Sequence, residues 1–376
     1  MSLFKASFER SLILSLTVLP VAAIVSLPKA AEAASFQNLY VFGDSLSDVG
    51  NVLRDTGGLV PPPVLPAFNG GLSPGYANGR FSNGPVWVEY LAKDLGLSLD
   101  TRNDFAYGGA TTGQENGLNP LLSQFGFPIT LPGLQQQIAT FQSQNPVPDQ
   151  DALYILWAGA NDYLNLNLTD PQGTVQNAIV NLSTAVTTLT SGGAKNFLIA
   201  NLPDLGKIPL TRGDLARSQG LSFLSSAHNT ALAQTLGVLP STLGVNIIPF
   251  DVNALINEAI ANPSPFGLTN VTEQCLPATP IFPDVPPPSI PCDPVKDAPN
   301  FLFWDPLHPT TKGHEILGEY AYSVLKSKSI QESSPVVLLL ALGTFFGSGA
   351  ALRRKRILKQ PVTNKTQLEE VAVGAE

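Results

Sequence analysis

Two segments that lie far apart in the chain contain the residue types of a serine-dependent hydrolase. Gly-Asp-Ser-Leu at 43–46 follows the apolar run 39–42, and Asp-Pro-Leu-His occupies 305–308. A serine hydroxyl is a weak nucleophile at neutral pH, so it needs a nearby base and a third group that orients the base. Of the three histidines, only His308 stands three residues after a carboxylate, Asp305. The two segments together indicate a split site in which Asp305 holds His308 toward Ser45.

Each segment taken alone also has a purely structural interpretation. A serine after a strand often caps a helix, and a glycine pair such as the one ending at Gly109 is typical of a turn. Asn161 is a common turn former, and 305–309 can be an exposed loop. In the functional interpretation, Ser45 stands at the start of a helix, and its N–H, the Gly109 N–H and the Asn161 side chain bind an oxyanion.

Short runs rich in β-branched and aromatic residues alternate with longer stretches of helical period. This pattern predicts βαβ units and an α/β fold, a three-layer αβα sandwich with an open five-stranded parallel sheet. The expected strands are 39–43, 103–107, 152–157, 196–200 and 245–250. The expected helices are 85–95, 133–144, 174–190, 215–236, 252–261 and 310–325. Ser45 and Asn161 would then lie beyond the carboxyl ends of strands, where such sheets bind ligands.

Three segments rich in proline and glycine are too long to be simple connections. They span 56–84, 113–133 and 263–300, and we expect them to line or cover the site. The third contains the only cysteines, Cys275 and Cys292. In an oxidising compartment such a pair is more often a disulfide than two free thiols, and without a nearby histidine it makes a poor zinc site. We therefore expect a disulfide and no metal or other cofactor.

The charge balance argues against a nucleic-acid partner. Residues 34–334 contain 12 Lys and Arg against 24 Asp and Glu, a net charge of −12. An acidic surface of this kind repels phosphate backbones. No internal repeat or linker divides residues 34–330, so we expect one domain over this range.

Both ends of the chain carry apolar segments that are expected to lie outside that domain. Lys5 and Arg10 precede the apolar stretch 11–27, and small residues follow at 31–33, so 1–33 is predicted to be a signal peptide, with a permanent anchor as the alternative. The 18 residues of 335–352 would cover about 27 Å as a helix. A basic patch and polar tail follow at 353–376. This pattern predicts a transmembrane or sorting helix whose basic end lies on the cytoplasmic side.

The four segments, in this order, resemble the GDSL esterase and lipase family, also called the SGNH hydrolases. Further matches at 79–87, 201–206 and 303–305 look like the phospholipase and haemolysin-like branch, and the C-terminal segment resembles a bacterial sorting signal of the Pro-Glu-Pro type. The resemblance implies a flavodoxin-like fold and a role for each matched residue. These are Ser45 as nucleophile, Asp305 as orienting group, His308 as base, and Ser45, Gly109 and Asn161 as oxyanion donors.

The resulting expectation is an exported serine esterase or lipase, outside the cytoplasm at the cell surface or in the periplasm. Its substrate would be a lipid-like or short-chain acyl ester. The protein would be a monomer and would contact the membrane through the C-terminal helix. The alternatives are an acyltransferase that uses the same site and a non-catalytic cell-surface binding module. A Gly-x-Ser-x-Gly match at 71–75 is interpreted as accidental, because Pro74 lacks the N–H that such an elbow uses as an oxyanion donor.

Overall fold

The computed structural model describes residues 36–332 except 63, 67–71, 146, 165–168, 277–288 and 290–291. The predicted signal peptide at 1–33, the predicted helix at 335–352 and the tail at 353–376 lie outside the described residues. Within the described ranges, no helix is long and apolar enough to cross a membrane.

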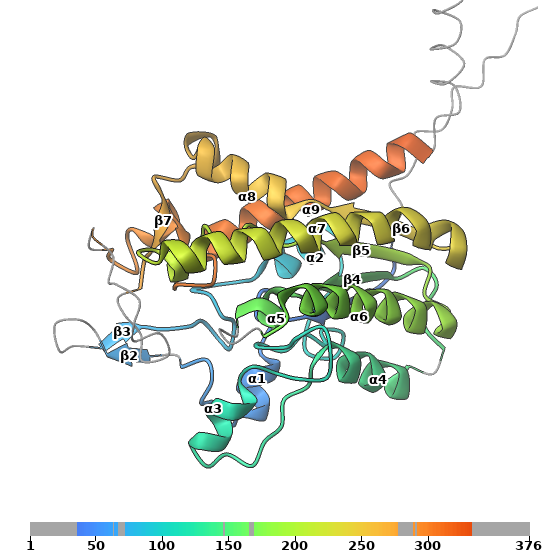
Figure 1. The fold of residues 1–376 in the computed structure, drawn as a ribbon, viewed down its shortest axis with the longest axis horizontal. Helices are drawn as coiled ribbons and strands as arrows, with labels where there is room; N and C mark the ends of the chain where they lie inside the picture. Colours follow the sequence, from blue (N-terminus) through green and yellow to red (C-terminus); the bar gives the residue numbers. More distant parts are fainter. Residues whose placement is uncertain are drawn as a thin grey trace, which may run out of the picture. The chain divides into compact units, whose positions relative to one another are not determined.

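A parallel sheet of four strands lies between two layers of helices (Figure 1). Its strands are β1 (Leu39–Gly43), β4 (Leu153–Trp157), β5 (Asn196–Ala200) and β6 (Asn246–Phe250), in the order β1-β4-β5-β6. Alternate residues of β4 enter different cores, Ile155 on one face and Leu156 on the other. Burial on both faces explains why the strands are nearly continuous apolar runs.

The fifth strand expected at 103–107 is an isolated bridge rather than a strand, which corrects the predicted count. The segment still runs along the free edge of β1, where Val41 N–H donates to Asn103 O and Phe105 N–H donates to Val41 O. Its outer side does not continue the sheet, because the Asn51 side chain donates to the carbonyl groups of Asp104 and Ala106. A side chain thus caps the edge that another strand would otherwise use.

The helices cover both faces of the sheet, so the predicted three-layer αβα architecture is confirmed. One core contains residues of α2 (Trp87–Leu95), α8 (Val252–Ala261) and α9 (Thr311–Glu332). The core on the opposite face contains residues of α4 (Leu134–Gln144) and α6 (Pro171–Gly192). The long helix α7 (Leu215–Leu243) contributes Leu221 and Leu224 to the first core and Leu232 and Leu236 to the second.

Shorter elements complete the described chain. The helical ones are α1 (Asn51–Asp55), α3 (Asn119–Gln124) and α5 (Ala160–Leu164), with 3-10 turns at Pro209–Thr211, Ser264–Phe266 and Ala298–Asn300. β2 (Val64–Pro66) and β3 (Leu72–Pro74) form an antiparallel pair, and β7 (Asn270–Gln274) pairs in parallel with β8 (Phe301–Phe303). No helix follows directly on Ser73, unlike the serine of a nucleophile elbow.

The start of α6 differs from the prediction because an aspartate caps its first turn. α6 begins at Pro171 rather than 174, because the Asp170 carboxylate accepts the N–H of Gly173. At the other end, α7 continues to Leu243, beyond the predicted end at 236, and stops at Gly244 in a left-handed conformation. α9 also runs further than predicted, to Glu332.

The predicted disulfide between Cys275 and Cys292 is present, with Cα atoms 5.1 Å apart. It belongs to a small apolar cluster that also contains Tyr76 and Trp304. Backbone bonds continue the β7–β8 pairing past the cysteine, since Leu276 N–H donates to Trp304 O. The disulfide therefore stabilises the backbone directly before residue 305.

A buried glutamine holds the carboxyl end of β1. The Gln137 side chain on α4 accepts the N–H of Gly43 at 2.9 Å and donates to its carbonyl at 2.8 Å. A side chain at Gly43 would also clash with the backbone oxygen of Trp157 on β4. Both constraints fix the last residue of β1 immediately before Asp44 and Ser45.

We expect Gln137→Leu to lower the free energy of unfolding by about 1 to 3 kcal/mol, because the buried Gly43 N–H loses its partner while the Gly43 carbonyl keeps only the Tyr107 N–H. The measurement is urea unfolding of the disulfide-bonded chain. Gln144→Leu, an exposed substitution at the end of the same helix, is the matched control and should change stability little. Equal unfolding midpoints for the two variants would contradict this role of Gln137.

Candidate active site

Ser45 lies in a tight turn at the carboxyl end of β1. The N–H groups of Ser47 and Asp48 both donate to Asp44 O. The expected helix start at Ser45 is therefore wrong, since α1 begins only at Asn51. The reason is Asp48, whose carboxylate accepts the N–H groups of Gly50, Asn51 and Val52 and so caps the helix several residues later.

A continuous hydrogen-bonded chain joins Ser45, His308 and Asp305. His308 Nε2 lies 2.8 Å from Ser45 Oγ, and His308 Nδ1 lies 2.7 Å from Asp305 Oδ2. Because the carboxylate can only accept, Nδ1 carries the proton and Nε2 is free to accept the serine proton. Asp305 is fully buried, so 305–309 is not an exposed loop. The structure thus brings together the three residues that the sequence singled out.

The Asp305 carboxylate is held by more than the histidine. Its Oδ1 accepts the N–H groups of Leu307 and His308, and its Oδ2 also accepts the Tyr76 hydroxyl at 2.6 Å. Burial alone would raise the pKa of Asp305, but the electrostatic interaction with His308 and the hydrogen bonds from His308, Tyr76 and Leu307 together lower it below 3.8. The carboxylate is therefore ionised at neutral pH.

Sequence reasoning missed Tyr76 because nothing local marks it. It lies in the predicted loop 56–84, and its partner Asp305 is 229 residues away. The same loop carries Phe81, whose ring centroid is 5.3 Å from that of His308. One loop therefore contacts both the imidazole and the carboxylate of the site.

The three predicted oxyanion donors line the same hollow as His308. Among the described residues, neither the Ser45 N–H nor the Gly109 N–H donates to a protein acceptor. Asn161 Nδ2 donates to Ala110 O at 3.0 Å, which leaves its second hydrogen available. Gly109 has a φ of +79°, and a Cβ there would lie 2.6 Å from the side-chain oxygen of Asn116, so this position requires glycine.

Two buried carboxylates hold the Gly109 loop in place. Asp48 accepts the N–H of Gly108 at 2.9 Å, which ties this loop to the turn after Ser45. Asp162, next to Asn161, accepts both the N–H and the hydroxyl of Thr112. Asp162 is thus a backbone anchor, and within the described ranges no group of histidine, cysteine and carboxylate side chains could hold a metal ion.

Burial shapes the electrostatics around the serine turn. It raises the pKa of Asp44 to about 7, with the Leu46 N–H and the electrostatic interaction with His308 acting in the opposite direction. It raises the pKa of Asp48 to about 6, although four backbone N–H groups donate to that carboxylate. At pH 7 the Asp48 carboxylate is then mostly ionised and the Asp44 carboxylate is about half ionised, so burial reduces the negative charge of the turn that carries Ser45 without removing it.

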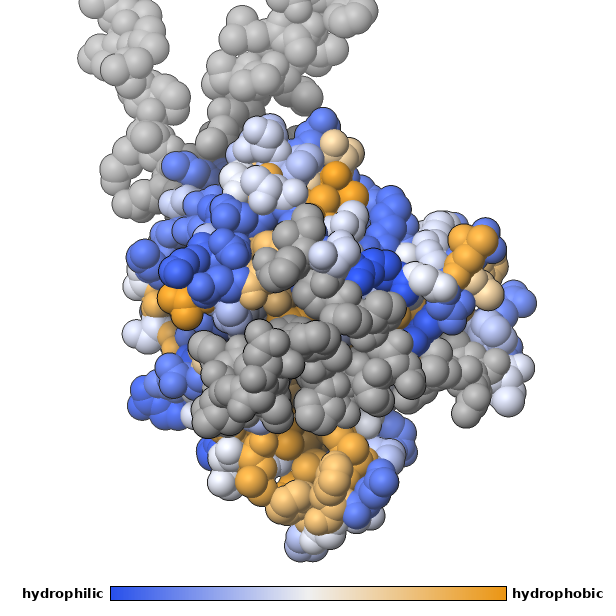
Figure 2. Space-filling view, turned by 90° about the vertical axis from the view of Figure 1, so that its left-hand side faces the viewer, coloured by the Kyte–Doolittle hydropathy of each residue, from blue (hydrophilic) through white to orange (hydrophobic). Residues whose placement is uncertain are grey.

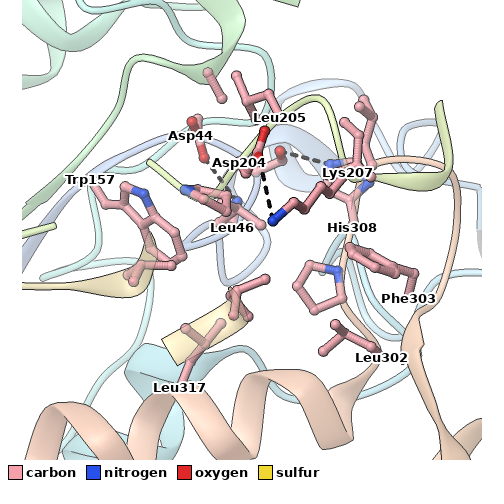
Figure 3. A pocket seen from close by; sticks show the side chains of 18 of the residues that line it. Asp44, Leu46, Trp157, Asp204, Leu205, Lys207, Leu302, Phe303, His308 and Leu317 are labelled. Carbon is pink, nitrogen blue, oxygen red and sulfur yellow. Dashed lines mark hydrogen bonds and ion pairs between the residues drawn. The ribbon is translucent and has the colours of Figure 1, made fainter. Parts of the chain in front are cut away.

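Two apolar hollows meet at Ser45 and His308. The first, seen in Figure 3, is lined by Leu46, Trp157 and Leu317, and Lys207 forms an ion pair with Asp204 in its wall. The second is lined mainly by the loops expected at 56–84 and 113–133, in line with the prediction. None of the described residues of 263–300 lines either hollow, and 277–288 and 290–291 lie outside the described residues, so the expectation for this segment stays a prediction.

Comparison with known proteins identifies the family. The model of the GDSL-like lipase/acylhydrolase family matches residues 39–321, and the chain belongs to this family. The chain is therefore a carboxylic ester hydrolase of the GDSL type, as the resemblance predicted.

Three relatives illustrate the range of proteins to which the chain is similar. It is 29% identical to a phosphatidylcholine-sterol acyltransferase of Aeromonas hydrophila, over 84% of this chain and 96% of that protein. It is 27% identical to a thermolabile hemolysin of Vibrio parahaemolyticus, over 77% of this chain and 64% of that protein. It is 28% identical to a GDSL esterase/lipase of Arabidopsis thaliana, over 74% of this chain and 84% of that protein. These relatives support the GDSL family that the sequence indicated.

We expect Tyr76→Phe to lower kcat/KM about fivefold at neutral pH, the effect of losing one hydrogen bond of about 1 kcal/mol. The lost bond is one of the interactions that lower the pKa of Asp305, so its removal raises that pKa. The carboxylate then takes up a proton at a higher pH, and activity is lost earlier on the acid side. The measurement is kcat/KM for a soluble p-nitrophenyl ester from about pH 3 to about pH 8.

The matched control is Tyr154→Phe, which removes a buried hydroxyl that donates to Asp149 O. It should leave the shape of the pH profile unchanged. Superimposable profiles for Tyr76→Phe and the unsubstituted chain would show that Tyr76 has no part in positioning Asp305.

Proposed function

We propose that the chain hydrolyses carboxylic esters with Ser45 as nucleophile, His308 as general base and Asp305 as the group that orients the base. The observation that carries this proposal is the uninterrupted relay of 2.8 Å and 2.7 Å from Ser45 Oγ through His308 to Asp305. The relay ends beside three hydrogen-bond donors that have room for an oxyanion.

The mechanism follows from these positions. Ser45 Oγ attacks the ester carbonyl carbon while His308 Nε2 takes its proton, and the negative charge moves to the carbonyl oxygen. The N–H groups of Ser45 and Gly109 and the Asn161 amide donate to that oxygen. The tetrahedral intermediate collapses when its bond to the alcohol oxygen breaks and His308 protonates the leaving alcohol. Water then attacks the acyl-enzyme by the same steps and releases the acid and free Ser45.

Lipid-like or short-chain acyl esters are the proposed substrates. The walls on both sides of Ser45 are built mainly of leucine, isoleucine, phenylalanine and tryptophan side chains, which favour apolar substituents over sugars. Residues 34–330 are the proposed catalytic domain, exported by a signal peptide at 1–33. The Cys275–Cys292 disulfide supports a location outside the cytoplasm, at the cell surface or in the periplasm.

Acyl transfer is the second candidate function, because the relative from Aeromonas hydrophila is named as an acyltransferase. An acceptor alcohol would replace water in the second half of the cycle, with His308 taking the alcohol proton. The test is product analysis with and without a short added alcohol. We expect free acid as the main product in both cases; predominance of the new ester would assign the chain to the transferases instead.

We expect Ser45→Ala to abolish hydrolysis of a short p-nitrophenyl ester and covalent labelling by a fluorophosphonate probe. Asn161→Ala should keep the labelling site but lower kcat about a hundredfold or more, the loss typical of one oxyanion donor. Both variants need circular dichroism spectra equal to that of the unsubstituted chain. Ester turnover at the unsubstituted rate by Ser45→Ala would rule out the assignment, and a folded chain that takes up no probe would indicate a binding module.

A further inference from the structure

An uncharged apolar rim surrounds the mouth of the second hollow. The segments 56–62 and 117–132 contain no Asp, Glu, Lys or Arg, in a chain whose net charge is −8. Leu59 and Phe125 in these segments are 50% and 67% exposed. Figure 2 shows apolar side chains gathered at the bottom of the view, at the height of α3 in Figure 1. We call the exposed side chains of 56–62 and 117–132 the α3 rim.

The α3 rim continues directly into the site. The hollow that it surrounds is lined by Leu59, Phe125 and further apolar residues, and it ends on Ser45, Gly109, Asn161 and His308. Leu122 and Leu131 of the segment 117–132 are buried in an apolar cluster with Val52 and Phe81, which lie outside the two segments. The rim therefore rests on a packed base, and its exposed side chains Leu59 and Phe125 border the hollow.

Large apolar side chains in contact with water are common when single, but a group of them around a cavity marks a binding surface. Phe223 on α7 is the useful comparison, because it is 70% exposed and lines a separate hollow between α6 and α7 that does not include Ser45 or His308. Exposure alone thus does not distinguish Phe125. Its position at the mouth of the hollow does.

We propose that the α3 rim docks on a lipid surface with uncharged or zwitterionic headgroups, from which the ester enters the hollow. This inference depends on the proposed function in one respect, namely that the hollow holds the ester. Among the described residues, exposed apolar side chains occur on only one side of this hollow. A second copy of the chain, or an apolar segment of the same chain, would close that side to the ester if it were bound there permanently. Charge does not supply the attraction, because the rim has none and the chain is acidic.

The test places a fluorescent reporter at the rim of the full chain. The three native tryptophans are at most 1% exposed, so they report little on the surface. In a Ser45→Ala background, we expect the emission of Phe125→Trp to shift to shorter wavelength on addition of phosphatidylcholine vesicles. Lipids with bromine on their acyl chains should quench it. Phe223→Trp in the same background is the matched control and should show neither change.

A second substitution measures the strength of the contact. Leu59→Ser should weaken the vesicle association of the Phe125→Trp reporter about threefold to tenfold, the effect of removing one partly inserted leucine. Equal shifts at positions 125 and 223, or none at 125, would overturn the proposal. So would a shift that depends on protein concentration without vesicles, which would indicate a second copy. Hydrolysis is measured separately on the unsubstituted chain, so an inactive enzyme and an absent lipid contact are distinct results.

Discussion

The buried negative charge of Asp305 is the constraint on which the site depends. Among the described residues no lysine or arginine pairs with it, so its ionised form rests on His308, two backbone N–H groups and the Tyr76 hydroxyl. Removing a carboxylate from water is costly unless its oxygens accept hydrogen bonds of this kind. The need to satisfy Asp305 explains why a loop from the first quarter of the chain packs on the last turn before α9. The apolar cluster around the disulfide contains Tyr76 and Trp304, the residue directly before Asp305, and so holds Tyr76 and Asp305 in place.

The other half of the site depends on the carboxyl edge of the sheet. β1 and β4 are neighbours in exact register, Gly43 opposite Trp157, and so the turn after β1 and the start of α5 lie side by side. Ser45 and Asn161 reach one place because parallel strands bring their carboxyl ends to one edge. Gln137 stabilises that edge from the helix layer, and Asp48 and Asp162 attach the Gly109 loop to it. Side chains thus bind the neighbouring backbone groups at this edge, whereas the N–H groups of Ser45 and Gly109 have no acceptor among the described residues.

The sequence predicted the sandwich because burial on two faces leaves a strong local pattern, and strands 39–43 and 196–200 match the structure residue for residue. It predicted the meeting of Ser45 and His308 because few residues can act as a base here. It failed where the deciding contact is distant. Gln137 and Tyr76 look like ordinary helix and loop residues, and their partners stand 94 and 229 residues away. The expected fifth strand failed for the same reason, since Asn51 caps its outer edge from another segment.

The shape of the site restricts the ester on both sides of its carbonyl group. In the proposed mechanism, the acyl chain on Ser45 would lie in one hollow and the departing alcohol would leave through the other. Both walls are apolar, so a sugar in either hollow would lose hydrogen bonds to water that few wall residues replace. An ester with apolar groups on both sides suffers no such loss. The proposed substrate also fits the uncharged α3 rim, because an ester of this kind would be concentrated in lipid assemblies rather than in water.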